Sequence, residues 1–278
     1  MQHLPSLIGH LPETEEPSVL VPTMGALHGG HAALIKAARE IAGKRGSVLV
    51  SIFVNPLQFD RPSDLAEYPR TLEDDLAMCR ELDVDTVFTP SSHEFYALDH
   101  STTVTESRLS RRLCGATRPG HFDGVCTVVL KLFTSLRPSA AVFGKKDYQQ
   151  LAIIRRLVRD LSVPVQIHSI ETVRECNGLA LSSRNSNLAA DQRTDAARIH
   201  RALRAARDLR ENGEQRPEVY LEAARYHLLQ DAPPEMKIEY LELVDRNTLQ
   251  PLSAVTGPAL LATAISYGDV RLIDNMEV

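Results

Sequence analysis

The segment Pro22–His31, PTMGALHGGH, combines two histidines with three glycines and is the part of the sequence best suited to phosphate chemistry. Glycines let the backbone approach a ligand, and a helix that begins here offers unpaired N–H groups and a positive dipole end to an anion. His28 and His31 are three residues apart, so both imidazoles can reach one anion. Such groups stabilise charge that develops on a reacting phosphate.

Two other interpretations of this segment stay open from its residues alone. The glycines can simply form a turn with both histidines on the surface, because four-residue matches such as H-x-G-H are common. The histidines can also bind a metal, although no third ligand lies nearby in the sequence. The position of the segment after the first predicted strand favours ligand binding, since ligands of α/β sheets bind where strands end.

Two further polar segments could also bind phosphate. Gly144–Gln150, GKKDYQQ, leaves a predicted strand and opens a helix without the spacing of a P-loop. Its lysines suit a phosphate and its glutamines a polar substrate, whereas solvated helix-start residues are the plainer interpretation. Leu181–Asn185, LSSRN, offers two hydroxyls and a guanidinium to a triphosphate, but Ser-Ser is also ordinary loop sequence.

Other polar residues have a functional and a plain interpretation side by side. Asn55–Phe59 and Arg118–Phe122 can contribute to a site or be turns and nothing else. Asp74 and Asp75 can hold magnesium, but the first turn of a helix favours carboxylates in any case. Arginines recur every three residues at Arg198, Arg201, Arg204, Arg207 and Arg210. They resemble a stripe that binds tRNA or phosphate, but a solvated helix face is the favoured interpretation, because apolar neighbours supply the core side.

The elements that must position these residues alternate between strands and helices, which predicts a parallel sheet of Rossmann-like type. The predicted strands are 19–21, 48–54, 86–88, 140–143 and 165–170. The helices predicted from apolar spacing are 32–42, 72–82, 125–136 and 148–161.

After Ser183 the pattern changes and predicts a smaller α+β unit. Its expected helices are 189–209 and 218–229, and its expected strands are 238–244, 259–264 and 270–273. The sequence therefore predicts an α/β protein with a catalytic domain over 1–184 and a smaller C-terminal domain over 185–278.

Composition excludes several classes of protein. The 278 residues include 31 Lys and Arg against 36 Asp and Glu, so a net charge of −5 gives no general attraction to nucleic acid or anionic lipid. The four cysteines are scattered, without a zinc or disulfide pattern, which favours a reducing compartment. No apolar run is long enough to span a membrane, and Met1–Glu16 is too acidic for a signal peptide. We expect a cytoplasmic protein.

Taken in order, the motifs resemble those of the pantothenate synthetase (pantoate–β-alanine ligase) family, within the H-x-G-H nucleotidylyltransferase superfamily. The resemblance covers nearly the whole chain. Besides the PTMGALH-x-GH segment, it rests on NPxQF at 55–59, YPRT-x-x-DD at 68–75, RPGHFxGV at 118–125, GKKDYQQL at 144–151, LxSSRN from Leu181 and RLIDN at 271–275.

The resemblance implies a cytoplasmic homodimer that joins D-pantoate to β-alanine through a pantoyl-adenylate, converting ATP to AMP and pyrophosphate with Mg²⁺. The chemistry is consistent, because an amine attacks a carboxylate only after the carboxylate oxygen becomes part of a good leaving group. Neutralising the charge of two anionic reactants is then the main task of the site. The alternative is a nucleotidylyltransferase of the same superfamily that acts on another small acceptor.

The resemblance also implies residue roles. His28, His31, Lys146 and Arg184 would act in catalysis, with His31 as proton donor. Gln58, Gln150 and Asn55 would bind pantoate, Gln58 would also meet β-alanine, and Asp74 and Asp75 match a magnesium position. Arg118 and His121 would support the site. The implied ATP-binding residues are Pro22, Thr23, Met24, Gly25, Ala26, Leu27, His28, Gly29, Gly30, His31, Gly144, Lys145, Lys146, Asp147, Val173, Leu181, Ser182, Ser183 and Arg184.

Overall fold

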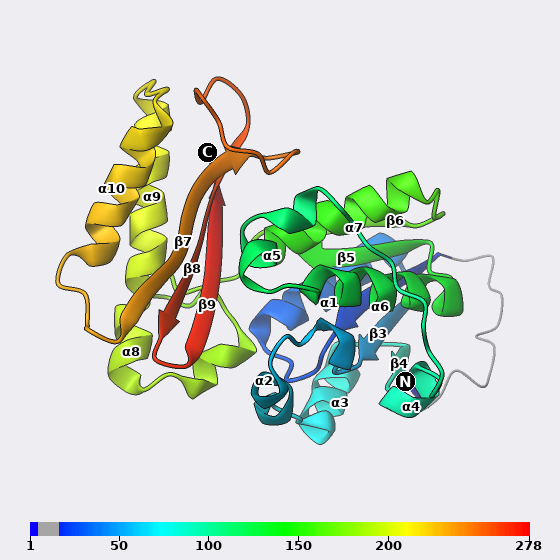
Figure 1. Ribbon diagram of the computed structural model, residues 1–278. Coiled ribbons are helices and arrows are strands. Elements are labelled where there is room, and N and C mark those ends of the chain that lie inside the picture. The colour runs from blue at the N-terminus through cyan, green and yellow to red at the C-terminus, as the bar shows by residue number, and fades with distance from the viewer. Residues whose placement is uncertain (5–16) are drawn as a thin grey trace. The chain divides into compact units, whose positions relative to one another are not determined.

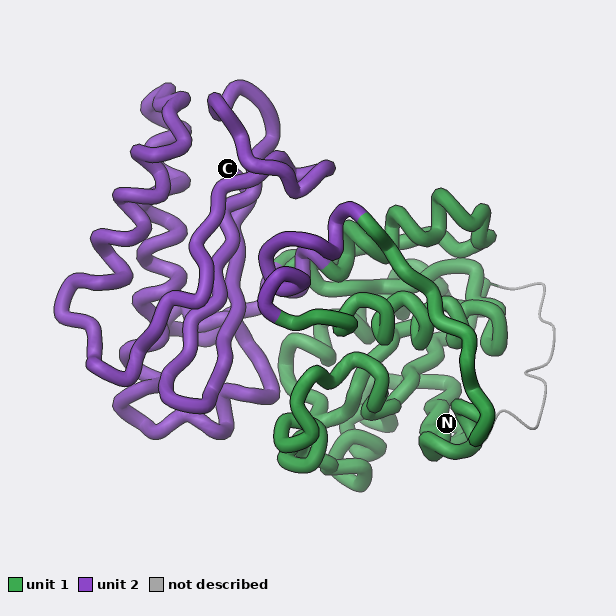
Figure 2. Tube along the Cα trace, in the orientation of Figure 1, with its two compact units in different colours: residues 1–107, 118–145, 150–171 green, residues 108–117, 146–149, 172–278 purple. Residues whose placement is uncertain are grey.

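The computed structural model describes residues 1–4 and 17–278, which form two compact units (Figure 2). The first unit contains Met1–Ser107, Arg118–Lys145 and Gln150–Glu171, and the second contains Arg108–Thr117, Lys146–Gln149 and Thr172–Val278. The expected domain limits, 1–184 and 185–278, stay a prediction. The expectation that Met1–Glu16 is no signal peptide concerns mainly residues 5–16, which lie outside the described residues.

A six-stranded parallel sheet forms the centre of the first unit, in the order β1-β4-β3-β2-β5-β6 (Figure 1). Its strands are β1 (Gln2–Leu4), β2 (Ser18–Thr23), β3 (Ser47–Ile52), β4 (Thr86–Phe88), β5 (Ala140–Gly144) and β6 (Gln166–Ile170). Apolar, β-branched runs form the central strands because both faces of a parallel sheet are covered. The predicted Rossmann-like sheet is therefore confirmed, while β1 is a strand that the sequence did not indicate.

The sheet has a topological switch point beside β2. This strand pairs with β3 on one side and with β5 on the other. The chain continues to β4 on the β3 side and to β6 on the β5 side, so the strand order reverses between β2 and β5. Ligands of open α/β sheets bind outside the carboxyl ends of strands at such a point. Two of the candidate motifs begin there, one after Thr23 and the other at Gly144.

Helices complete the first unit and fix the ends of its strands. The longer ones are α1 (Gly29–Ala42), α3 (Leu72–Glu81), α6 (His121–Leu136) and α7 (Tyr148–Asp160), whose first two residues belong to the second unit; α2 (Pro62–Glu67) and α4 (Ser92–Phe95) are short. Ile35 and Ala38 of α1 are fully buried against Val19 and Val48 of the sheet. This packing holds the beginning of α1 at the end of β2.

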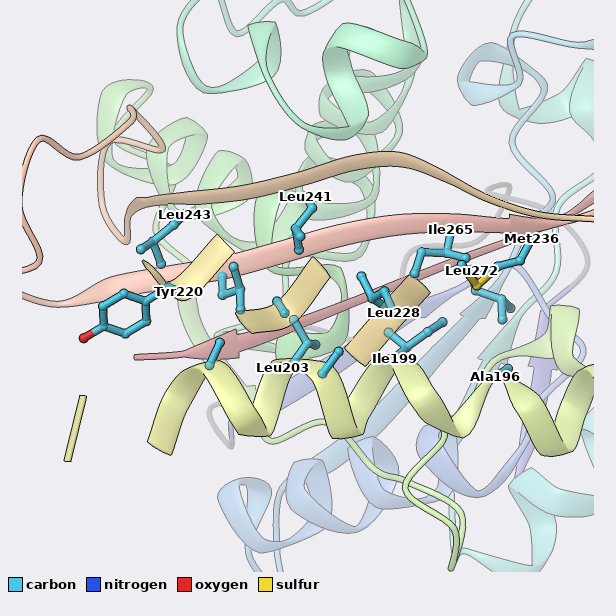
Figure 3. Packing of buried hydrophobic residues seen from close by; sticks show 14 of the residues in the cluster. Ala196, Ile199, Leu203, Tyr220, Leu228, Met236, Leu241, Leu243, Ile265 and Leu272 are labelled. Carbon is cyan, nitrogen blue, oxygen red and sulfur yellow. The ribbon is translucent and has the colours of Figure 1, made fainter. Parts of the chain in front are cut away.

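The second unit is built on a three-stranded antiparallel sheet of β7 (Met236–Asp245), β8 (Ala259–Tyr267) and β9 (Val270–Glu277). The helices α9 (Ala197–Glu211) and α10 (Pro217–Leu229) pack on it, and their apolar side chains form one core with those of the strands (Figure 3). Leu203 and Tyr220 are among the fully buried residues of this core. The predicted smaller α+β unit is confirmed. The unit also includes α5 (Cys114–Thr117).

Two local expectations for this unit are wrong. The helix expected over 189–209 is broken at Ala196 into α8 (Ala190–Asp195) and α9. Beside this break, the Asp195 carboxylate binds both the Tyr267 hydroxyl and the Arg198 guanidinium. Arg198 is also not part of a solvated face. It is 7% exposed and donates to the carbonyls of Leu228 and Gln230, which satisfies the end of α10.

None of the helices formed by the described residues has both the length and the apolar character that crossing a bilayer requires.

Candidate active site

Left-handed backbone angles and hydrogen bonds fix the conformation of the loop after β2. Gly25 and Ala26 have φ of 82° and 50°, in the left-handed region, which glycine enters at little cost. The Thr23 hydroxyl donates to the carbonyl of Ser51 at 2.8 Å and accepts the N–H of Gly25 at 3.2 Å. A Cβ on Gly25 would lie 2.9 Å from Asp75 Oδ2, so this position also requires glycine for space.

The Asp75 carboxylate holds this loop from α3. Its Oδ2 accepts the N–H of Ala26 at 3.0 Å, and its Oδ1 accepts the N–H of Leu27 at 2.8 Å. The Thr71 hydroxyl donates to the same Oδ1 at 3.1 Å. Asp75 is 2% exposed, and these donors compensate the burial of its charge. The contacts of the Asp75 carboxylate are therefore those of a group that positions the backbone of this loop.

The two histidines cap α1 reciprocally. His28 Nδ1 accepts the N–H of Gly30 at 3.1 Å, and His31 Nδ1 accepts the N–H of His28 at 3.2 Å. A backbone N–H can only donate, so each neutral ring carries its hydrogen on Nε2. The ring centroids are 4.2 Å apart. Two Nε2–H donors thus lie side by side at the N-terminus of a 14-residue helix, where the dipole also favours an anion.

A buried chain of amides orients Gln58 in the turn Pro56–Gln58. The Tyr96 hydroxyl donates to Asn55 Oδ1 at 3.0 Å, and Asn55 Nδ2 donates to Gln58 Oε1 at 3.0 Å. Gln58 Nε2 then points to Met24 Sδ, 3.0 Å away. Gln58 is 8% exposed and Asn55 only 1%. The donor end of the Gln58 amide is thereby directed to the loop that carries the histidines.

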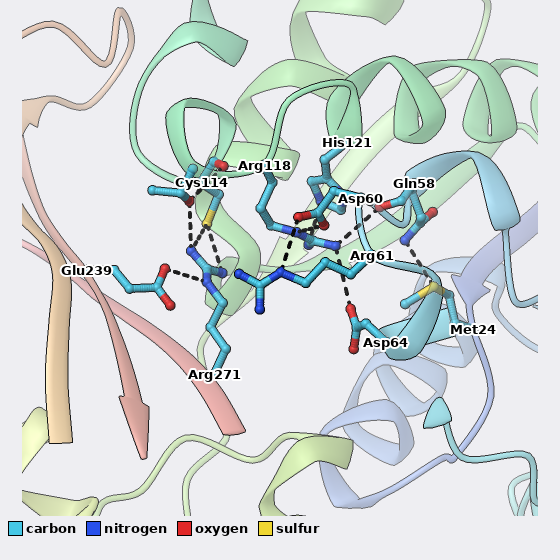
Figure 4. A network of polar contacts seen from close by, with 11 residues as sticks. Met24, Gln58, Asp60, Arg61, Asp64, Cys114, Arg118, His121, Glu239 and Arg271 are labelled. Atoms are coloured by element: carbon cyan, nitrogen blue, oxygen red, sulfur yellow. Dashed lines mark hydrogen bonds and ion pairs between the residues drawn. The ribbon is translucent and has the colours of Figure 1, made fainter. Parts of the chain in front are cut away.

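The RPGHF segment holds the backbone of Gln58, as Figure 4 shows. The Gln58 carbonyl accepts from His121 Nδ1 at 2.7 Å and from an Arg118 nitrogen at 3.2 Å. Arg118 Nε also donates to Asp60 at 2.9 Å. Burial alone would raise the pKa of Asp60, but its hydrogen bond with Arg118 leaves this pKa below the ordinary value. Arg118 and His121 thus both hold the backbone of Gln58, and their predicted role in supporting the site stays a prediction.

Helix α6 approaches the Gln58 turn at Gly124. A Cβ on Gly124 would lie 2.3 Å from the carbonyl oxygen of Leu57, so only glycine allows this approach. The Gly124 carbonyl also accepts from Asn55 Nδ2 at 3.0 Å. The second glycine of RPGHFxGV, Gly124, is therefore explained by close packing against the turn.

Several candidate phosphate-binding residues lie together in the second unit. Lys146, Ser182 and Asn185 line one pocket, with Asp274 of β9. Ser182 also accepts the N–H of Arg184 and so begins the short helical turn Ser183–Asn187. Asn185 Oδ1 is buried and has no hydrogen-bond partner in the described part of the chain. The pocket thus brings a lysine, a hydroxyl and an amide oxygen close together, beside apolar side chains such as Leu179 and Ile199.

The remaining predicted residues have other contacts. Lys145 forms an ion pair with Glu171 in the first unit. The Val173 carbonyl accepts the N–H of Leu181 at 2.9 Å, which closes a short hairpin. Gln150 is half-buried, whereas its neighbour Gln149 is buried and donates to the carbonyls of Leu109 and Arg112. The roles predicted for Gln150 and Val173 stay predictions.

The magnesium prediction concerns two residues in different surroundings. Asp74 is exposed, whereas both oxygens of Asp75 already accept hydrogen bonds. Among the described residues, no three His, Cys, Asp or Glu side chains gather in a way that could hold a metal. The magnesium role predicted for Asp74 and Asp75 stays a prediction.

Sequence reasoning missed several residues that position the site. Tyr96 gives no local signal, since its partner Asn55 is 41 residues away. Arg174 and Asp274, paired in the second unit, are 100 residues apart. Asn275 lies in the recognised RLIDN segment, yet its contact with the Lys146 carbonyl depends on folding.

Comparison with known proteins gives one consistent family. The model of the family described as pantoate-beta-alanine ligase matches residues 2–277. A pantothenate synthetase from Akkermansia muciniphila is 54% identical over 260 residues, covering 94% of this chain and 92% of that protein. One from Pelobacter propionicus is 50% identical over 256 residues, covering 92% of this chain and 88% of that protein.

Solved structures agree. The crystal structure of pantothenate synthetase from Thermus thermophilus has a TM-score of 0.92 and 42% identity, with 99% of each chain covered. A pantoate-beta-alanine ligase from Francisella tularensis, complexed with beta-gamma ATP and beta-alanine, has a TM-score of 0.78 and 33% identity, with 99% of this chain and 97% of that chain covered.

Proposed function

The chain belongs to the pantoate–β-alanine ligase family, and from this premise we propose which of its residues carry out the reaction. The family's reaction condenses D-pantoate with β-alanine at the expense of ATP, through a pantoyl-adenylate. In the first step the pantoate carboxylate oxygen attacks the α-phosphorus and pyrophosphate leaves. In the second, the β-alanine amine attacks the acyl carbon, AMP leaves, and the amine loses a proton.

His28 and His31 stabilise the first transition state. The observation that supports this most directly is their reciprocal capping, which commits both Nδ1 atoms to the backbone and gives Nε2 the hydrogen. Two preorganised N–H donors and a helix N-terminus can then meet the negative charge that develops on the α-phosphate and on leaving pyrophosphate. His31 donates a hydrogen bond from Nε2 to the leaving pyrophosphate; the transfer of a whole proton, which the family resemblance implies, would also require a proton on Nδ1 and so the loss of its bond from the His28 N–H.

Gln58 binds pantoate and orients its carboxylate. The amide chain from Tyr96 supports this role, because it presents Nε2 as the donor, the polarity that a carboxylate or hydroxyl oxygen needs. Pro22, Met24 and Phe59 offer apolar contact to the dimethyl carbon of pantoate. Gln150 and Asn55 were also predicted to bind pantoate; the nearly complete burial of Asn55 favours an indirect role through Gln58.

Lys146 and the segment Leu181–Arg184 bind the ATP phosphates from the second unit. Their shared pocket supports this assignment, since Lys146 supplies a cation and Ser182 a hydroxyl. Mg²⁺, when bound, would neutralise triphosphate charge. Because both oxygens of Asp75 already accept hydrogen bonds, Asp74 would be the carboxylate that helps to hold it. A homodimeric, cytoplasmic enzyme completes the proposal.

The test is a product analysis with MgATP and D-pantoate, with and without β-alanine. We expect pyrophosphate and an enzyme-bound adenylate in the absence of β-alanine, and equal amounts of AMP and pantothenate in its presence. His31→Asn should abolish most pyrophosphate release while the protein stays folded. A released nucleotidyl product without pantothenate would instead indicate a nucleotidylyltransferase.

A further inference from the structure

Two adjacent residues of β9, Asp274 and Asn275, contact the backbone and side chains that surround the Lys146 pocket. Asn275 Nδ2 donates to the carbonyl of Lys146 at 2.8 Å. The Asp274 carboxylate accepts two hydrogen bonds from Arg174, at 2.6 and 2.9 Å. Asp274 itself lines the pocket with Lys146 and Ser182. All these residues belong to the second unit.

The Asn275 contact fixes the turn that carries Lys146. This turn, Lys145–Asp147, directly precedes α7, and its lysine side chain is 20% exposed with Nζ 3.7 Å from Asp147. A lysine side chain is a flexible chain of four methylene groups, so the direction of its ammonium depends on how firmly its backbone is held. Asn275 is 8% exposed, and its backbone pairs with Ala262 in the sheet of the second unit.

The Asp274 contact fixes the hairpin that leads into Ser182. Besides the two bonds to Asp274, Arg174 donates to the carbonyl of Gly178 at 3.2 Å. Arg174 and Ala180 form an antiparallel bridge, and Leu181 continues the hairpin by donating to Val173. The bidentate pair thus sets where the chain leaves the hairpin and, with it, the place of Ser182 and Arg184.

The same pair solves an electrostatic problem. The Asp274 side chain is 3% exposed, and a carboxylate beside a triphosphate would repel it strongly in such surroundings. Arginine stays protonated at all working pH values and can neutralise the carboxylate without consuming a proton. Arg174 therefore affects the pocket in two ways: it holds the hairpin that leads to Ser182, and it neutralises the negative charge of Asp274.

We propose that Asp274 and Asn275, with Arg174, are positioning residues that shape the pocket of Lys146 and Ser182 for the ATP phosphates. The inference rests on the proposed function in one respect, that Lys146 binds those phosphates. Arg271, the first residue of the RLIDN segment, has different contacts (Figure 4). Its Nε donates to Glu239 at 2.7 Å, and Glu239 does not line this pocket.

The first experiment measures steady-state kinetics of Asn275→Asp and Asn275→Gln. Aspartate has the size of asparagine but no donor, so we expect the KM for ATP to rise about tenfold, the effect of losing a buried hydrogen bond, with the KM for pantoate within about twofold. Glutamine keeps the donor and should recover part of the loss. Arg271→Gln is the matched control, since it also removes a polar contact of β9 and should leave the KM for ATP unchanged.

The second experiment uses charge. Arg174→Gln leaves the Asp274 carboxylate unneutralised and should raise the KM for ATP by at least about tenfold. Asp274→Asn keeps one oxygen that accepts from Arg174 and leaves an extra cation, so this KM should stay at or below the wild-type value. The double variant restores a neutral pair and should lie within about threefold of wild type. A purely structural pair would instead give two losses of the same sign, and the double variant, which loses the shared contact only once, would stay as impaired as the single variants.

Lys146→Ala separates failure of this inference from failure of the proposed function. If that variant leaves both the KM for ATP and kcat unchanged, the phosphate role of Lys146 is wrong. If it impairs ATP use while Asn275→Asp and Arg174→Gln do not, the positioning roles are wrong. Thermal unfolding of each variant identifies loss of folding, in which case the milder Asn275→Gln and Asp274→Asn carry the comparison.

Discussion

His31 Nδ1 accepts the backbone N–H of His28 at 3.2 Å, so one histidine of the motif fixes the backbone of the other. His28 in turn caps the helix on which His31 stands. The spacing of H-x-G-H therefore has a structural reason as well as a chemical one, because the third residue of a helix is the one that reaches back to its cap. Capping and catalysis use opposite nitrogens of the same rings.

This division predicts different results for two substitutions of His31. Asparagine places an oxygen near the position of Nδ1 and keeps the cap, but it has no group at Nε2. His31→Asn should therefore unfold near the wild-type temperature while the rate of pyrophosphate release falls by about two to three orders of magnitude. His31→Ala should show the same kinetic loss and also lose stability. Pantoate-dependent turnover that persists in His31→Asn would refute the catalytic role.

The contacts of Asp75 predict that Asp75→Asn behaves as a loop defect. The substitution sets an amide N–H₂ against the N–H of Ala26 or Leu27, which should cost about 1–3 kcal/mol of unfolding free energy and raise the KM for ATP. Asp74→Asn, at the exposed neighbour, should change stability by less than about 0.5 kcal/mol. Urea unfolding and ATP kinetics measured over a range of Mg²⁺ concentrations check both statements.

The dependence of the ATP kinetics on Mg²⁺ concentration distinguishes a loop defect in Asp75→Asn from the loss of a metal ligand. A lost metal ligand is compensated by more metal, whereas a distorted loop is not. We therefore expect excess Mg²⁺ to leave the KM for ATP of Asp75→Asn unchanged. Recovery of wild-type kinetics at high Mg²⁺ would assign Asp75 to the metal.

Elements that depend on local sequence could be predicted, whereas contacts between residues far apart in the sequence could not. Strands such as β4, predicted at 86–88 and observed at Thr86–Phe88, depend on local apolar runs that the sequence displays. The Asp75 contact joins residues 48 apart and depends on a turn with positive φ, so two acidic residues at a helix start gave no sign of it. Arg198 likewise has the spacing of a surface residue, and only the end of α10 makes it a buried donor.

Two buried thiols predict a loss of stability at alkaline pH. Burial raises the pKa of Cys79 to about 11, helped by the charge of Asp75, and that of Cys126 to about 12, from an ordinary value of 9.0. The unfolded chain loses these protons at lower pH than the folded protein does. The stabilisation is therefore complete below pH 9 and declines as the pH rises from there towards 11 and 12.

Urea unfolding between about pH 8 and pH 10.5 measures this dependence. Cys79→Ala should reduce the slope of unfolding free energy against pH above 9, whatever its effect on stability at neutral pH. Cys176→Ala, at an exposed cysteine, should leave the slope as it is. Equal slopes for wild type and Cys79→Ala would show that this thiol does not titrate differently in the two states.

The amide chain predicts graded effects on pantoate. Gln58→Ala removes the donor and should raise the KM for pantoate by at least about tenfold, with a much smaller change for ATP. Tyr96→Phe removes only the hydroxyl that orients Asn55, 3.0 Å from it, so Gln58 keeps its donor but loses part of its orientation. We expect a rise of about threefold in the KM for pantoate and an unchanged KM for ATP.

Equal effects on both substrates in Gln58→Ala would contradict the assignment of this amide to pantoate. A larger effect of Tyr96→Phe than of Gln58→Ala would show that Tyr96 does not act through Gln58.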